Sequence, residues 1–217
     1  ATGSGKTTLA GLIPRFYDAT QGTVLVDGVD VRDYTFDALY DRLGYVTQKA
    51  VLFSGTVQDN IFFGQSEAAD TDETLQQALQ LSQAAEFVDR YPEKAAHPIA
   101  QLGRNVSGGQ KQRLSIARAL ARRPEILIFD DSFSALDYKT DATLREGLAK
   151  QLPGTTKIIV AQRISTIRNA DQILVLDRGE IAGLGTHDEL MVSCPVYREI
   201  AMSQLSEEEL KKGGASK

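Results

Sequence analysis

The sequence is short of several residue types, and each shortage excludes a class of protein. One cysteine, Cys194, occurs in 217 residues, which excludes a disulfide scaffold and indicates a reducing compartment. The chain has only two histidines and this one cysteine, which does not support a structural zinc site. No apolar run approaches the roughly 18 to 20 residues that a membrane-spanning helix needs. The densest apolar runs are residues 126–129, 158–161 and 173–176.

Positive charge is also in short supply. Lys and Arg number 24 against 29 Asp and Glu, a net charge of −5 with no dense basic face, so we expect no nucleic-acid partner. The content of 42% apolar and 24% charged residues is that of a globular chain and excludes disorder and collagen. The chain begins at Ala1 with no signal segment, which indicates a piece of a longer protein.

Short β-branched runs alternate with longer helical patterns. This alternation predicts an α/β domain with a mainly parallel sheet and helices on both faces. The expected strands are 23–26, 43–47, 126–129, 157–161 and 172–176, and the expected helices are 6–13, 73–81, 83–91 and 110–122. No strand is expected between Asn60 and Arg123, so residues 60–123 are predicted to be an inserted helical subdomain. Residues 203–217 are predicted to be a terminal helix and tail, with Glu207–Lys211 and Glu208–Lys212 pairs.

A glycine-rich segment stands at the start of the chain. It fits the phosphate-loop (P-loop) pattern G-x-x-x-x-G-K-[ST], with the first glycine falling one position before Ala1, so we expect the motif and its preceding strand to be cut. Lys6 would reach the β- and γ-phosphates, and the Thr7 hydroxyl would ligate Mg²⁺. The alternative interpretation is a glycine-rich turn before a helix, with no role in nucleotide binding. The candidate phosphate-binding residues are Gly3, Ser4, Gly5, Lys6, Thr7 and Thr8.

An aspartate ends the apolar run 126–129. Because ligands bind at the carboxyl edge of such a sheet, Asp130 is expected to hold Mg²⁺ near the P-loop, although an isolated aspartate there could also be a turn or cap residue.

A Ser-Gly-Gly-Gln segment precedes the predicted helix 110–122. One interpretation of this segment is structural, because Ser107 and Gln110 fit a capping box at the start of the helix. A capped helix start with two glycines also offers N–H groups to an anion, so Ser107, Gly108, Gly109 and Gln110 could contact the phosphate of a second nucleotide.

Taken together, these motifs resemble the ATP-binding-cassette (ABC) ATPase family over essentially the whole chain. The resemblance equates Gln48 with the family's Q-loop glutamine, 107–110 with its signature, 126–130 with its Walker B strand, 134–137 with its D-loop and 159–166 with its switch region. It implies ATP and Mg²⁺ as cofactors, with Thr7, Gln48 and Asp130 at the metal and Asp137 at the nucleotide. It also implies head-to-tail dimerisation with a second ABC ATPase domain. The segments 46–61 and 185–190 look like those of exporters, which implies transmembrane domains, expected upstream, and a place on the cytoplasmic face of the plasma membrane.

Two positions depart from the family pattern. Asp131 stands where most members carry a glutamate, and Gln162 stands where the pattern has a histidine. Aspartate is one methylene shorter, and glutamine cannot carry a positive charge. With Gln48, these are the candidate catalytic residues. The combination resembles the degenerate-site subunit of heterodimeric exporters of drugs or lipids, so we expect this chain to bind ATP and hydrolyse it slowly.

Two alternatives stay open. The domain could belong to a homodimeric exporter with two equal, weakened sites, or to a soluble ABC protein that acts on ribosomes or DNA. His187 follows Thr186 in a Thr-x-x-Glu capping box, so a structural role is expected for it.

Overall fold

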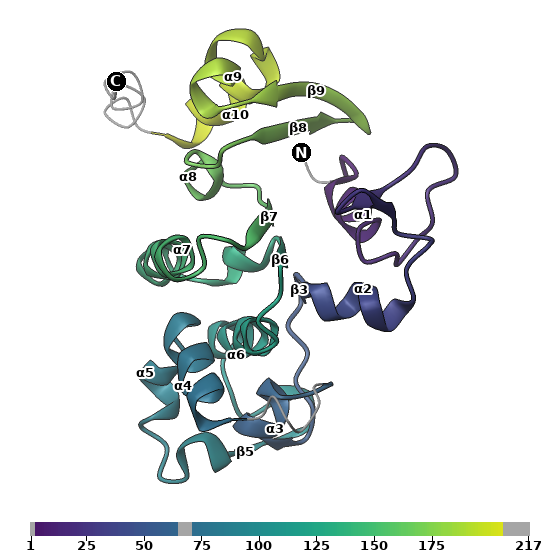
Figure 1. The fold of residues 1–217 in the computed structure, drawn as a ribbon. Coiled ribbons are helices and arrows are strands. Elements are labelled where there is room, and N and C mark those ends of the chain that lie inside the picture. Colours follow the sequence, from purple (N-terminus) through teal and green to yellow (C-terminus); the bar gives the residue numbers. More distant parts are fainter. Residues whose placement is uncertain (1–2, 65–70, 206–217) are drawn as a thin grey trace.

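The computed structural model describes residues 3–64 and 71–205 and is built around a parallel sheet. Its three strands lie in the order β3-β6-β7 and comprise Leu43–Val46, Ile126–Asp130 and Thr156–Val160 (Figure 1). Leu127, Ile128 and Phe129 of the middle strand are all 0% exposed, as expected of a strand covered on both faces. The predicted α/β fold with a mainly parallel sheet and an inserted helical part is confirmed.

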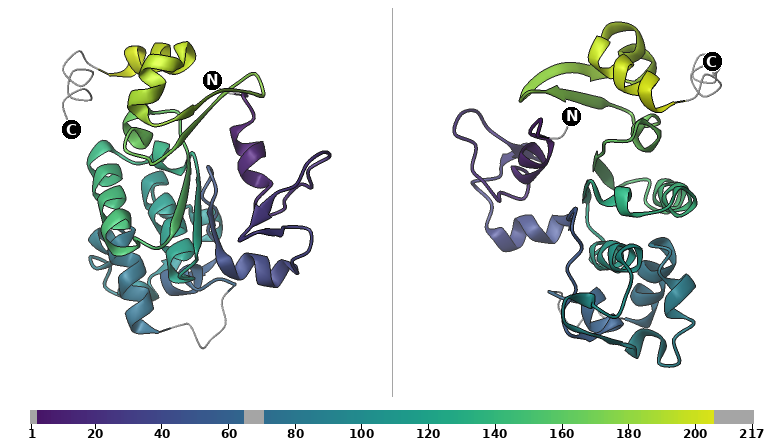
Figure 2. Two further views of the ribbon diagram at one scale, coloured as in Figure 1. Left: turned by 45° about the horizontal axis from the view of Figure 1, so that its top comes forward. Right: turned by 180° about the vertical axis from the view of Figure 1, so that it is seen from behind.

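Helices cover both faces of this sheet. α1 (Lys6–Gly11) and α2 (Phe36–Arg42) lie on one side, and α6 (Gly108–Ala121) and α7 (Tyr138–Gln151) lie on the other, as Figures 1 and 2 show from three directions. Side chains cap three of these helices, because Thr35 accepts a hydrogen bond at the start of α2, Ser107 at the start of α6 and Asp137 at the start of α7.

A largely helical part lies between β3 and β6. It contains β4 (Gly55–Thr56), α3 (Val57–Ile61), α4 (Asp72–Leu81), α5 (Ala85–Val88), β5 (Pro98–Ile99) and α6, with 3₁₀ turns at Lys94–Ala96 and Gln101–Gly103. Its apolar side chains join the core beneath the sheet, where Leu79, Leu114 and Ile116 are fully buried.

Two expectations for this part were wrong. A strand does occur here, because Pro98–Ile99 pairs antiparallel with Gly55–Thr56. Two residues are too few to show the alternation that marks a strand. The expected helix 83–91 is only Ala85–Val88, since Gln83 has a φ of 62°, outside the helical region, and separates it from α4.

The outer expected strands do not join the parallel sheet. Of residues 23–26 only β1 (Leu25–Val26) is a strand, and it forms a hairpin with β2 (Val29–Asp30). β8 (Ile173–Asp177) pairs antiparallel with β9 (Glu180–Gly185), which was not expected. The pairing partner rather than the strand's own sequence decides direction, which is why the sequence pattern misplaced both segments.

The last part of the described chain has a small hydrophobic core of its own. It holds α8 (Ile164–Ile167), α9 (His187–Ser193) and α10 (Pro195–Gln204), and α9 and α10 lie against β8 and β9 (Figure 2). Of the terminal helix and tail expected at 203–217, the structure describes only the first three residues, of which 203 and 204 end α10, and residues 206–217 with their Glu–Lys pairs lie outside the described residues. Among residues 3–64 and 71–205, no helix is both long and apolar enough to cross a membrane.

His187 has the structural surroundings expected for it. The Thr186–Glu189 capping box is present, and the His187 Nδ1 lies 2.8 Å from the Tyr197 hydroxyl in the small core. Burial is the main reason why the pKa of His187 falls below its ordinary value. Cys194 is likewise buried, with a free thiol.

Candidate functional site

The glycine-rich loop enters α1 through two left-handed residues. Gly3 has a φ of 81° and Gly5 a φ of 90°, a conformation that glycine adopts without the strain a side chain would bring. Within the described residues no side chain caps the start of α1, the end of a helix at which anions bind. The loop thus has the backbone that phosphate binding requires.

A cavity of about 240 Å³ gathers the loop with three distant segments. Gln48 enters it after β3, Asp131 after β6 and Gln162 after β7, all at the carboxyl ends of parallel strands. Its lining consists of Gly3, Ser4, Gly5, Lys6, Thr7, Thr8, Gln48, Asp131, Val160 and Gln162. The topology therefore brings together residues up to 159 positions apart, since 162 − 3 = 159.

Lys6 is one of the residues that line this cavity. Its Nζ donates a hydrogen bond to Ser4 Oγ at 2.8 Å, and Ser4 itself is only 3% exposed. The ammonium group therefore lies beside the loop that would hold the phosphates.

The next group is suited to Mg²⁺. Thr7 Oγ1 donates to Asp130 Oδ1 at 2.8 Å, so a hydroxyl and a carboxylate meet at the cavity edge. Mg²⁺ prefers hard oxygen ligands and is often held by one or two protein groups plus phosphates and waters. No cluster of three or more His, Cys, Asp or Glu side chains able to hold a metal occurs in residues 3–64 and 71–205. Thr7 and Asp130, with Gln48 in the lining of the same cavity, could hold an ion that takes its remaining ligands from ATP and water.

Two amides hold the carboxylate of Asp131. Its Oδ2 accepts a hydrogen bond from Gln48 Nε2 at 3.1 Å and another from Gln162 Nε2 at 2.9 Å. Asp131 also has a left-handed backbone, with φ 48° and ψ 24°, and the residue is 8% exposed. Two of the positions at which this carboxylate could accept a hydrogen bond are therefore already used, which restricts how it can meet a water molecule.

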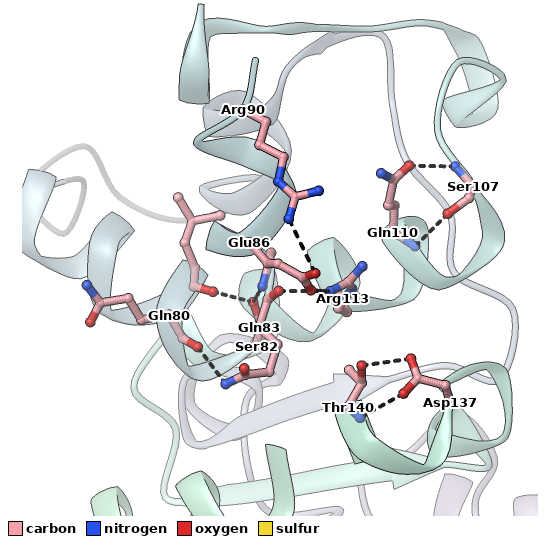
Figure 3. A network of polar contacts seen from close by, with 12 residues as sticks. Gln80, Ser82, Gln83, Glu86, Arg90, Ser107, Gln110, Arg113, Asp137 and Thr140 are labelled. Atoms are coloured by element: carbon pink, nitrogen blue, oxygen red, sulfur yellow. Dashed lines mark hydrogen bonds and ion pairs between the residues drawn. The ribbon is translucent and has the colours of Figure 1, made fainter. Parts of the chain in front are cut away.

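The signature residues form a separate group at the start of α6. Gln110 N donates to Ser107 Oγ at 3.2 Å and Ser107 N to Gln110 Oε1 at 2.8 Å, so the expected capping box is present (Figure 3). Further along α6, Arg113 Nη1 donates to the Gln83 carbonyl at 3.0 Å and to Glu86 at 2.8 Å. These bonds fix the start of α6 against the neighbouring helices.

Asp137 caps α7 beside the signature. Its Oδ1 accepts from Thr140 N at 2.9 Å and its Oδ2 from the Thr140 hydroxyl at 2.8 Å (Figure 3). The backbone N–H of Thr140, ahead of its hydroxyl, lowers the pKa of Asp137. A Cβ added at Gly109 would lie 3.6 Å from the Ala135 carbonyl, so the signature and the D-loop segment run close together. Neither Asp137 nor any of Ser107–Gln110 lines the P-loop cavity.

Two residues near the cavity were not found from the sequence. Tyr45 donates its hydroxyl to Asp130 Oδ2 at 3.1 Å, and Gln204 of α10 donates to the Gln162 carbonyl at 2.8 Å. Burial, followed by the Asp130 charge, raises the pKa of Tyr45, so its phenol remains a neutral donor. The register of β3 against β6 would have revealed Tyr45, but no sequence signal connects residue 204 with residue 162.

Changing Lys6 to alanine is expected to weaken ATP binding by roughly tenfold to a hundredfold, because a charge-assisted hydrogen bond to phosphate is lost. Titration with a fluorescent ATP analogue measures the change. Lys150→Ala is the matched control, since Lys150 lies 73% exposed on α7 beside Glu146. Equal affinity in the Lys6 variant and the wild type would contradict the proposed place of phosphate.

Comparison with known proteins agrees with this geometry. The model of the family described as "ABC transporter" matches residues 1–134. An uncharacterized ABC transporter ATP-binding protein of Mycobacterium bovis is 48% identical over 205 residues, which are 94% of this chain and 35% of that protein. An ATP-dependent lipid A-core flippase of Syntrophus aciditrophicus is 40% identical over 209 residues, 96% of this chain and 34% of the flippase.

A solved structure is similar over nearly the same range. It is the structure of a bacterial Atm1-family ABC exporter with ATP bound, which matches with a TM-score of 0.90 and 37% identity over 95% of this chain and 36% of the exporter chain. The chain thus spans about a third of the length of these relatives. The matched family, these relatives and the assembled P-loop cavity show that the chain belongs to the ABC transporter family, as an ATP-binding domain of the ATPase type.

Proposed function

We propose that this domain powers the export of a substrate by an ABC transporter, and that its own nucleotide site hydrolyses ATP slowly. Export is supported by the names of two similar proteins, a lipid A-core flippase and an Atm1-family exporter. In such an assembly the domain would lie on the cytoplasmic face of the membrane, bound to transmembrane domains.

Slow hydrolysis at this site is supported mainly by the environment of Asp131. The side chain is a methylene shorter than glutamate, and the amides of Gln48 and Gln162 both hold the same carboxylate oxygen. A shortfall on the order of 1 Å in the position of a catalytic group can cost about a hundredfold in rate. Gln162 cannot place an imidazolium at the γ-phosphate, so transition-state charge is also less well stabilised.

Nucleotide binding is left intact by these changes. Lys6, Thr7 and Asp130 line or border the cavity with the side chains that phosphates and Mg²⁺ need. We therefore infer that the domain holds Mg-ATP firmly while its partner completes most turnovers.

The partner is proposed to be a second ABC ATPase domain on a different subunit. The signature residues at the start of α6 do not line this chain's own P-loop cavity, although they offer a capped helix start with two glycines. A head-to-tail dimer would place them over ATP held by the partner's P-loop. The partner would then supply the glutamate and histidine that this chain lacks.

Changing the partner's catalytic glutamate to glutamine in the assembled transporter tests this function. We expect steady-state ATP hydrolysis to fall by roughly a hundredfold or more, because only this chain's slow site remains. Transport in membrane vesicles should fall with it. Near-normal turnover would contradict the slow site, and a partner gene with aspartate and glutamine at the same two positions would favour a dimer of two equal sites.

A further inference from the structure

We propose that Tyr45 is a positioning residue for the Mg²⁺ site: its hydroxyl holds one carboxylate oxygen of Asp130 so that the other oxygen faces Thr7. This inference rests on the proposed binding of Mg-ATP. It assigns a role to a side chain that lies outside the lining of the nucleotide cavity.

The sheet register places Tyr45 on the correct face. In the parallel pairing of β3 with β6, Tyr45 lies opposite Ile128. Side chains alternate between the faces of a strand, so Asp130, two residues after Ile128, lies on the same face as Tyr45 and one step along. An aromatic side chain can span that step, and its phenolic oxygen lies 3.1 Å from Asp130 Oδ2.

Each carboxylate oxygen of Asp130 therefore has its own donor. Oδ1 accepts from the Thr7 hydroxyl at 2.8 Å, and Oδ2 accepts from Tyr45. Without the Tyr45 hydroxyl, Thr7 would hold the carboxylate at one oxygen, and the carboxylate plane could turn about its last side-chain bond. With it, both oxygens are held and the orientation of the carboxylate plane toward Thr7 is fixed before a metal arrives.

The ring of Tyr45 is itself held in place. It packs edge-on against Phe16, with ring centroids 5.0 Å apart and planes inclined by 64°. Asp130 is 4% exposed, so water does little to replace a lost partner. Partners that orient metal ligands in this way typically change metal affinity by roughly 10- to 100-fold when removed.

A purely structural role makes a different prediction. If Tyr45 only satisfies a buried acceptor, its loss would lower thermal stability and leave the Mg²⁺ dependence of nucleotide binding where it is. If it orients a ligand, the Mg²⁺ requirement moves while ATP binding without Mg²⁺ does not. The two roles are thus separated by a metal titration.

The experiment uses the transporter proposed above, with the partner's P-loop lysine changed to alanine so that only this chain's site binds. A fluorescent ATP analogue is titrated at a series of Mg²⁺ concentrations and again in EDTA. We expect Tyr45→Phe to raise the Mg²⁺ concentration for half-maximal binding about tenfold, with binding in EDTA unchanged. Mn²⁺ titration followed by electron paramagnetic resonance should show a weakened metal site in the presence of ATP.

Tyr34→Phe is the matched control, because it removes a phenolic hydroxyl that donates to the Val26 carbonyl at 3.1 Å and not to Asp130. Should Tyr45→Phe fail to fold, Phe16→Leu loosens the ring and keeps the hydroxyl, and a smaller shift in the same direction is expected. An unmoved Mg²⁺ requirement in a folded Tyr45 or Phe16 variant overturns the inference. Failure of the wild type to bind ATP would instead overturn the proposed function.

Discussion

Replacing Asp131 by glutamate and Gln162 by histidine together is expected to raise ATP turnover at this chain's own site by roughly a hundredfold. The glutamate adds the missing methylene and carries its carboxylate further into the cavity that Gln48 and the P-loop share. The histidine removes one of the two amides that hold Asp131 Oδ2 and adds a group that can be positively charged. Both changes are needed for the full increase, because each restores a different part of the transition-state contact.

The measurement isolates the site. The partner's catalytic glutamate is changed to glutamine, so the residual steady-state ATPase of the transporter reports this chain alone. Asp18→Glu is the matched control, since it makes the same chemical change at an exposed side chain paired with Arg15. The left-handed backbone of residue 131 tolerates aspartate better than glutamate, so a small loss of thermal stability is expected in the double variant.

Turnover that is highest in the double variant would establish that these two residues limit the site. Residual activity that is already high in the unmodified chain, or that stays low after both changes, would contradict this explanation. The single variants are expected to fall between the wild type and the double variant.

The sequence predicted the parts of the site whose signal is local. The P-loop is a contiguous pattern of glycines with a lysine and a threonine, and the observed left-handed φ of Gly3 and Gly5 is what that pattern requires. Asp130 could be placed because the apolar run 126–129 ends directly before it. The capping boxes at Ser107 and Thr186 also span only four residues each, and both are present.

What the sequence could not predict depends on pairing between distant segments. The Tyr45–Asp130 bond needs the register of β3 against β6, and a shift of one residue would turn Tyr45 to the other face. The bond from Gln204 to Gln162 needs α10 to fold back over the end of β7. Gln48 and Gln162 both donate hydrogen bonds to Asp131, and these three residues follow three different strands. No sequence pattern marks such a contact.

The same reasoning explains the misplaced outer strands. Residues 172–176 have the apolar character of a sheet strand, and Ile173 and Val175 are indeed buried. Their direction is set by β9, whose sequence Glu-Ile-Ala-Gly-Leu-Gly contains two glycines and no alternation of apolar and polar residues that would have marked a strand. A run of buried residues predicts a strand, but only its partner determines whether the pairing is parallel.

Changing Ser107 to arginine is expected to lower the transporter's steady-state ATP hydrolysis by roughly a hundredfold or more, because it acts on the partner's site. Ser107 is exposed at the start of α6, where its hydroxyl accepts a hydrogen bond from Gln110 N and caps the helix (Figure 3). In a head-to-tail dimer, arginine would fill the space that the partner's γ-phosphate needs. ATP binding at this chain's own P-loop should stay unchanged, since Ser107 does not line that cavity.

Two further variants separate the blocked site from simple damage to the helix. Thr35→Arg removes a comparable exposed N-cap from α2, a loss of about 1 kcal/mol, without approaching the signature. Ser107→Gly keeps most of the capping stability but lacks the bulk, so only a mild loss of activity is expected. Photolabelling with an azido-ATP analogue should show less nucleotide trapped by the partner in the Ser107→Arg transporter. Because the proposed partner carries out most turnovers, undiminished hydrolysis in that variant would contradict head-to-tail pairing directly.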